Sequence, residues 1–71
     1  MSYATARQRL PMWPGAGQTS ADRVGLIEQG EQVPIIGRAV VMRDGATTEW
    51  LQVRRGGRVG WIRAAMVREG D

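Results

Sequence analysis

Few side chains in this 71-residue chain could do chemistry, because it contains neither histidine nor cysteine. Their absence removes the commonest general base, the thiolate nucleophile and the ligands of nearly every zinc, haem or iron–sulfur site. Glu28 and Glu31 flank Gly30, an arrangement typical of an exposed turn rather than of a catalytic carboxylate pair. No histidine or lysine is present to activate the hydroxyl groups of Thr47 and Thr48. We therefore expect a protein that is not an enzyme and that binds no cofactor or metal.

The three tryptophans, Trp13, Trp50 and Trp61, are the best candidates for a binding site. Side chains alternate between the two faces of a strand, so Trp50 is on the face opposite to that of Leu51, and Trp61 is on the face opposite to that of Ile62. If the aliphatic side chains fill the interior, both indoles lie on the outer surface, beside the loop that carries Trp13. Such a cluster could hold a peptide or a sugar–peptide by stacking and apolar burial. The alternative is a structural role, in which the indoles close the ends of a fold that has no phenylalanine.

All ten basic residues are arginine, and seven acidic residues leave a net charge of +3. Acidic residues are interspersed and no basic run exceeds two residues, which favours a mixed-charge surface over a nucleic-acid interface. Arg58 and Arg63 are predicted at the rim of the tryptophan cluster, where their guanidinium groups could clamp a ligand carboxylate. The chain has no apolar run long enough for a membrane span, and its first residues do not resemble a signal peptide. The compartment stays open: the cell envelope or the exterior if the chain belongs to a longer secreted protein, and the cytoplasm otherwise.

Short strands must position these side chains, because ten glycines and three prolines divide the chain into short segments. Pro11 begins a predicted loop that runs to about residue 20. Pro34 indicates an edge position or a bulge, and Gly37 indicates a bend. The predicted strands cover residues 3–9, 23–28, 32–42, 49–54 and 59–63, followed by a helical turn at 64–66 and a final strand from Val67.

Five or six short antiparallel strands and one helical turn near the C-terminus predict a small all-β barrel. A chain of this length forms a single domain, here residues 1–71. The predicted interior consists of aliphatic side chains, namely Val24, Leu26, Val33, Ile35, Val40, Leu51, Val53, Ile62 and Val67.

The last third of the chain resembles the closing hairpin of a bacterial SH3 domain. The residues that carry the resemblance are Glu49-Trp-Leu-Gln-Val53, the glycine pair at 56–57, Gly60-Trp-Ile62 and Met66-Val67. Upstream, residues 10–17 and 24–33 stand where the family has its first loop and its following strands. The resemblance covers about residues 4–68 and implies an SH3-like barrel.

The resemblance also implies a function. In this family such domains are non-catalytic modules that bind a peptide, a peptidoglycan fragment or a protein partner, and they are commonly attached to cell-wall hydrolases. Pro11 and Trp13 replace the usual Asn and Arg, and Met66 replaces the usual Tyr, so we expect a groove unlike the standard one for proline-rich peptides. Two alternatives stay open: an SH3-like barrel that binds RNA or a ribonucleoprotein, and a structural or intramolecular domain of a larger protein.

Overall fold

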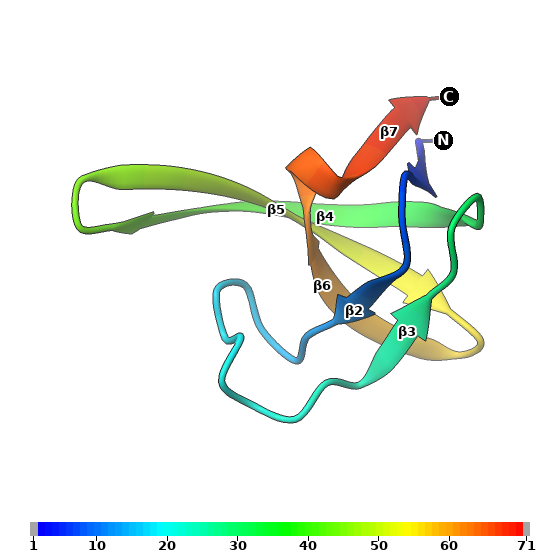
Figure 1. Cartoon of the computed structure of the whole chain (residues 1–71), viewed down its shortest axis with the longest axis horizontal. Coiled ribbons are helices and arrows are strands. Elements are labelled where there is room, and N and C mark those ends of the chain that lie inside the picture. The colour runs from blue at the N-terminus through cyan, green and yellow to red at the C-terminus, as the bar shows by residue number, and fades with distance from the viewer. Residues whose placement is uncertain (1, 71) are drawn as a thin grey trace.

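A computed structural model describes residues 2–70, which form seven β-strands and one 3₁₀ turn, η1 (Figure 1). This confirms the predicted all-β fold with a helical turn near the C-terminus. One strand was not predicted: β2, which includes Pro11, lies where the sequence predicted a loop. The elements are β1 (Tyr3–Ala6), β2 (Leu10–Met12), β3 (Gly25–Ile27), β4 (Gln32–Arg43), β5 (Ala46–Arg55), β6 (Arg58–Arg63), η1 (Ala64–Met66) and β7 (Val67–Gly70).

Five strands form one antiparallel sheet in the order β6-β5-β4-β1-β7, and β2 pairs with β3 in a separate ladder. The short ladder packs beside β6, where Trp13 and Trp61 form an isolated antiparallel bridge. Because β1 pairs with β7, with Tyr3 opposite Gly70, the two ends of the described part of the chain lie close together (Figure 1). The result is a small, barrel-like fold.

The β4–β5 hairpin is much longer than the other pairings and projects from the barrel (Figure 1). Its turn residues Asp44 and Gly45 both have positive φ, at 53° and 77°, as a two-residue turn matched to strand twist requires. The pairing register of β4 with β5 shifts between Ile35 and Gly37. The sequence-based prediction of a bulge near Pro34 is therefore confirmed, whereas an edge position is wrong, because β4 lies between β5 and β1.

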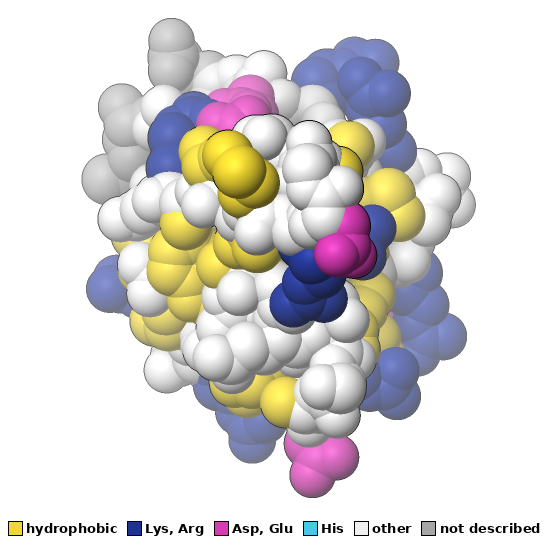
Figure 2. Space-filling view, turned by 90° about the vertical axis from the view of Figure 1, so that its left-hand side faces the viewer, with side chains coloured by type: hydrophobic (Ala, Val, Ile, Leu, Met, Phe, Trp, Pro, Cys, Tyr) yellow, Lys and Arg dark blue, Asp and Glu magenta, His cyan; other side chains and the backbone are white. Residues whose placement is uncertain are grey.

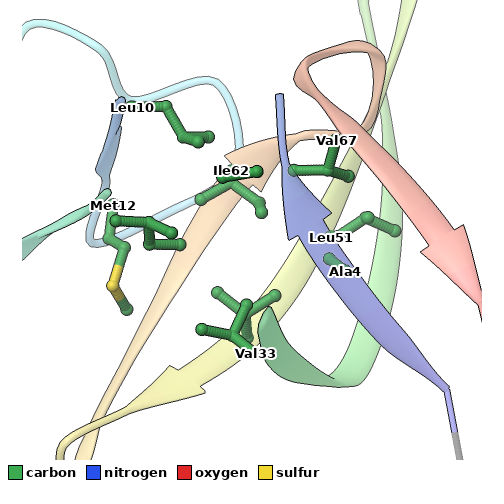
Figure 3. Packing of buried hydrophobic residues seen from close by; sticks show 10 residues of the cluster. Ala4, Leu10, Met12, Val33, Leu51, Ile62 and Val67 are labelled. Carbon is green, nitrogen blue, oxygen red and sulfur yellow. The ribbon is translucent and has the colours of Figure 1, made fainter. Parts of the chain in front are cut away.

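Ten buried side chains form one hydrophobic cluster inside the barrel (Figure 3). Five of them were predicted, namely Val33, Leu51, Val53, Ile62 and Val67; the other five are Ala4, Ala6, Leu10, Met12 and Ile27. Val24 and Ile35 pack against this cluster while remaining partly exposed. Leu26 is only half-buried and lies outside the cluster.

The prediction that Val40 is a core residue is wrong, since 64% of it is exposed. Val40 lies on the part of β4 that pairs with Glu49 in the projecting hairpin. This part of the hairpin projects beyond the barrel (Figure 1), so the apolar side chain of Val40 stays largely in solvent.

A glycine allows β2 to approach β6 closely. Gly60 is buried, and a Cβ atom added there would lie 2.9 Å from Met12 Cβ and 2.9 Å from Val24 Cγ2. Both distances are shorter than ordinary van der Waals contact, so a larger residue would push β2 outward. Gly60 thus allows the short ladder to bring Trp13 against Trp61.

Candidate functional site

Trp13 and Trp61 lie side by side although they are 48 positions apart in the chain. The backbone N–H of Trp13 donates to the carbonyl of Trp61 at 2.8 Å, and the reverse bond is 2.7 Å. Residues that exchange both hydrogen bonds in an antiparallel pair carry their side chains on the same face. Both residues are half-buried. The loop that carries Trp13 therefore folds beside β6, as predicted.

Trp50 lies on the same outer face of the sheet as Trp61, but it is not exposed. Trp50 pairs with Arg63 and Trp61 pairs with Gln52 across β5 and β6, so the predicted strand parity is right. The predicted exposure is wrong, because only 2% of Trp50 is accessible. The Arg63 guanidinium lies 5.4 Å from the centre of the Trp50 ring, within the range of a cation–π interaction.

The loop between β2 and β3 helps to cover this indole. At Gly17, whose φ is 78°, an added Cβ atom would lie 3.3 Å from Val41 Cγ1, so the loop runs close to β4. Arg43 donates a long hydrogen bond of 3.4 Å to the carbonyl of Gly17. Gly17, Val41 and Trp50 line the same hollow. Burial of Trp50 thus depends on a loop whose position cannot be read from strand parity.

Two adjacent hollows lie along this face. The first, called here the apolar hollow, has a volume of about 250 Å³ and is lined by Leu10, Pro11, Trp13, Thr19, Arg63 and Met66. The second, called here the polar hollow, has a volume of about 320 Å³ and is lined by Gly17, Thr19, Val41, Arg43, Asp44, Ala46, Thr48, Trp50 and Arg63. Thr19 and Arg63 line both, so the two hollows are neighbours, and together they are called the groove. The apolar hollow is smaller than the roughly 300–1,000 Å³ of most small-molecule pockets and the polar hollow lies at the lower end of that range. Both are open to solvent, so each suits a side chain of a larger ligand.

Arg63 stands at the centre of this groove with no partner for its charge. Among residues 2–70 it has no carboxylate within ion-pair distance and its N–H groups donate to no acceptor. A third, more open hollow on its other side is lined by Glu49 and Glu69. Both carboxylates are bound by Arg38. The contact with Trp50 therefore holds Arg63 in place while leaving its donors free.

Trp50 contributes a second free donor. Its indole Nε1 is buried and has no hydrogen-bond partner within the described part of the chain. An unmet buried donor costs about 1–3 kcal/mol, and native structures contain few of them. Trp50, which lines the polar hollow, therefore has a donor that a ligand could use.

Of the other nine arginines, three form ion pairs among the described residues, namely Arg9, Arg38 and Arg55. Arg55 donates to Glu31, and this bond, together with the backbone N–H of Glu28, lowers the pKa of the Glu31 carboxyl group. Hydrogen bonding to Glu69 raises the pKa of Arg38. Figure 2, which looks onto the projecting hairpin, shows basic, acidic and apolar side chains intermingled. This face carries no continuous basic stripe.

The structure brings three of the five predicted site residues to the groove, namely Trp13, Trp50 and Arg63. Trp61 lines neither hollow, and its contact with Trp13 is the pairing of the two backbones. Arg58 lies away from the groove, where it donates to the carbonyl of Val24 at 3.0 Å. Groove residues outside the predicted set include Pro11 and Met66. Both stand at positions where the sequence departs from the SH3 pattern, and that departure is the feature from which their place in the groove could have been predicted.

Searches against family models, curated proteins and solved structures found no match to this chain. Within residues 2–70, no three histidine, cysteine, aspartate or glutamate side chains gather in a way that could hold a metal ion. The same part of the chain contains no helix long and apolar enough to cross a membrane.

Proposed function

We propose that this chain is a non-catalytic binding module that holds an extended peptide in the groove formed by the two hollows. The observation that carries the proposal is that the two hollows are neighbours with different linings. Pro11, Trp13 and Met66 make an apolar wall in one hollow, and Arg63 is shared with the second hollow, which also carries Arg43, Asp44 and Thr48. An extended peptide presents alternate side chains to one surface, and adjacent hollows of side-chain size fit that geometry.

The resemblance of residues 49–67 to bacterial SH3 domains supports the same class of function. On the basis of this resemblance we propose an SH3-like barrel whose ligand is a peptide, a peptidoglycan peptide or a segment of a partner protein. The small all-β fold agrees with this interpretation. Arg58 is left out of the proposed site because its guanidinium already binds a backbone carbonyl.

The RNA alternative has less support from the distribution of charge. The net charge is only +3, and acidic side chains lie among the basic ones on the face shown in Figure 2, whereas phosphate binding favours a concentrated basic patch. A purely structural role leaves the two adjacent hollows without a use.

The proposal is tested by NMR titration of the ¹⁵N-labelled protein with muropeptides and with proline-rich peptides. We expect a peptide to shift the indole N–H signal of Trp13 and the amide signals of Thr19 and Met66. Trp13→Ala should weaken this binding about tenfold or more, since truncating a central aromatic contact often costs about 2 kcal/mol.

Trp61→Ala is the matched control, because Trp61 is also half-buried on this face but does not line either hollow. It should retain most of the affinity. If no peptide shifts an indole signal, or if the two variants bind equally, the groove is not the binding site.

A further inference from the structure

The geometry points to an acidic peptide as the ligand: we infer that Arg63 receives an aspartate or glutamate side chain of the bound peptide while a neighbouring apolar side chain fills the apolar hollow. This inference rests on the proposed peptide-binding function and adds the chemistry of the ligand. It is carried by three features of the groove.

The first feature is the free and pre-positioned charge of Arg63. The Trp50 ring holds the guanidinium group at 5.4 Å, and no carboxylate of residues 2–70 forms an ion pair with it. A guanidinium group fixed by stacking loses little side-chain entropy when it binds, and its planar fork matches a carboxylate. The nearby Glu49 and Glu69 compete weakly, because Arg38 already binds both.

The second feature is the balance of charge in the polar hollow. Two arginines, Arg43 and Arg63, line it against one acid, Asp44. Arg43 makes only a 3.4 Å contact with the carbonyl of Gly17. The hollow therefore has an excess of positive charge and of hydrogen-bond donors, which complements an anionic side chain and disfavours a basic one.

The third feature is the buried indole N–H of Trp50, which has no acceptor within the described residues. This N–H belongs to the ring that Arg63 covers, and Trp50 lines the polar hollow. A carboxylate bound to Arg63 in this hollow would lie beside the Trp50 ring, next to a residue that has an unused donor.

Two side chains of an extended peptide that are two residues apart point to the same side. The two hollows are adjacent and share Thr19 and Arg63, so the inference predicts an apolar residue and an acidic residue at this spacing. Both hollows are open to solvent, which allows the peptide to continue beyond them, and we therefore assign the carboxylate to a side chain rather than to a chain end.

The test uses pools of octapeptides that are acetylated at the N-terminus and amidated at the C-terminus. One pool carries a leucine followed two residues later by a glutamate, and a second pool has glutamine in place of the glutamate. A third pool keeps the glutamine but has a free C-terminal carboxylate. Affinity is measured from the indole and amide NMR shifts of the full chain at low salt and at about 0.5 M NaCl.

We expect the glutamate pool to bind about tenfold more tightly than the glutamine pool, as for a hydrogen bond to a charged group. The difference should shrink at high salt because the site is open to solvent. Glutamate binding should also move the Trp50 indole N–H signal. Arg63→Gln should remove the preference for glutamate, whereas Arg68→Gln, the same change on β7 outside the groove, should keep it.

The outcomes separate the two proposals. If both capped pools bind equally, the groove binds peptides but the inference about charge is wrong. If the third pool matches the glutamate pool, the carboxylate belongs to a chain end and the inference is also wrong. If no pool binds, the proposed peptide-binding function itself fails.

Discussion

The close approach of β2 to β6 at Gly60 leads to a quantitative prediction. In Gly60→Ala the new methyl group would lie 2.9 Å from Met12 Cβ, 2.9 Å from Val24 Cγ2 and 3.0 Å from Met12 Cε. The two terminal atoms can move by side-chain rotation, but Met12 Cβ moves only with the backbone of β2. Overpacking a core by one methyl group costs about 1–3 kcal/mol, and the backbone clash places this variant in the upper half of that range.

A loss of about 2–3 kcal/mol is large for this chain, because a domain of this size is stable by roughly 4–10 kcal/mol. The melting temperature should fall by roughly 10–20 °C, since each kcal/mol corresponds to about 4–8 °C in a small domain. The free energy of unfolding is measured by urea titration with tryptophan fluorescence as the signal. Because β2 leads into Trp13, the folded variant should also show a shifted Trp13 indole signal.

Gly70→Ala is the matched control for Gly60→Ala. Gly70 lies in β7, and nothing comes within 4 Å of an added Cβ atom there. Both variants reduce the entropy of the unfolded chain by the same substitution, so the difference between them isolates the clash. If both unfold at the same urea concentration, β2 does not pack against β6 as described and the account of the groove must be revised.

Two further predictions concern the hairpin and an ion pair. Val40→Ala should change the free energy of unfolding by less than about 0.5 kcal/mol, because Val40 is 64% exposed. Leu51→Ala, in the core, should lower that free energy by about 2–5 kcal/mol. Equal losses for the two variants in urea titrations would contradict the burial described. Arg55 lowers the folded-state pKa of the Glu31 carboxyl group. The ion pair therefore stabilises the folded state at pH values above the ordinary carboxyl pKa of about 4.3, and this stabilisation is lost as the pH falls through the lowered value. Glu31→Gln should therefore make unfolding less dependent on pH in this acidic range than Asp22→Asn does, and identical pH profiles would refute the role of the pair.

Much of the secondary structure follows from local patterns in the sequence. Gly56 and Gly57 both have positive φ, at 58° and 79°, and the hairpin predicted around them joins β5 and β6. Residues 64–66 form the predicted helical turn. These features depend on backbone preferences of single residues, so the sequence predicts them without knowledge of the rest of the fold.

The candidate site was predictable only in part. Alternation along β5 and β6 correctly places Trp50 and Trp61 on one face of the sheet. Alternation says nothing of what lies above that face, and a loop and Arg63 bury Trp50. The same limit explains the error at Val40, an apolar residue of a predicted strand that lies on a hairpin extending beyond the barrel.

The sequence by itself determined that this protein is built from short strands and carries neither histidine nor cysteine, because these properties belong to composition and to local backbone geometry. Only the tertiary structure decided which tryptophans meet, which arginines pair with a carboxylate, and which hollows lie next to each other. Those properties depend on contacts between residues far apart in the chain, such as Trp13 with Trp61 and Arg38 with Glu69. Such contacts are set by how the strands close into a barrel, and no local pattern encodes them.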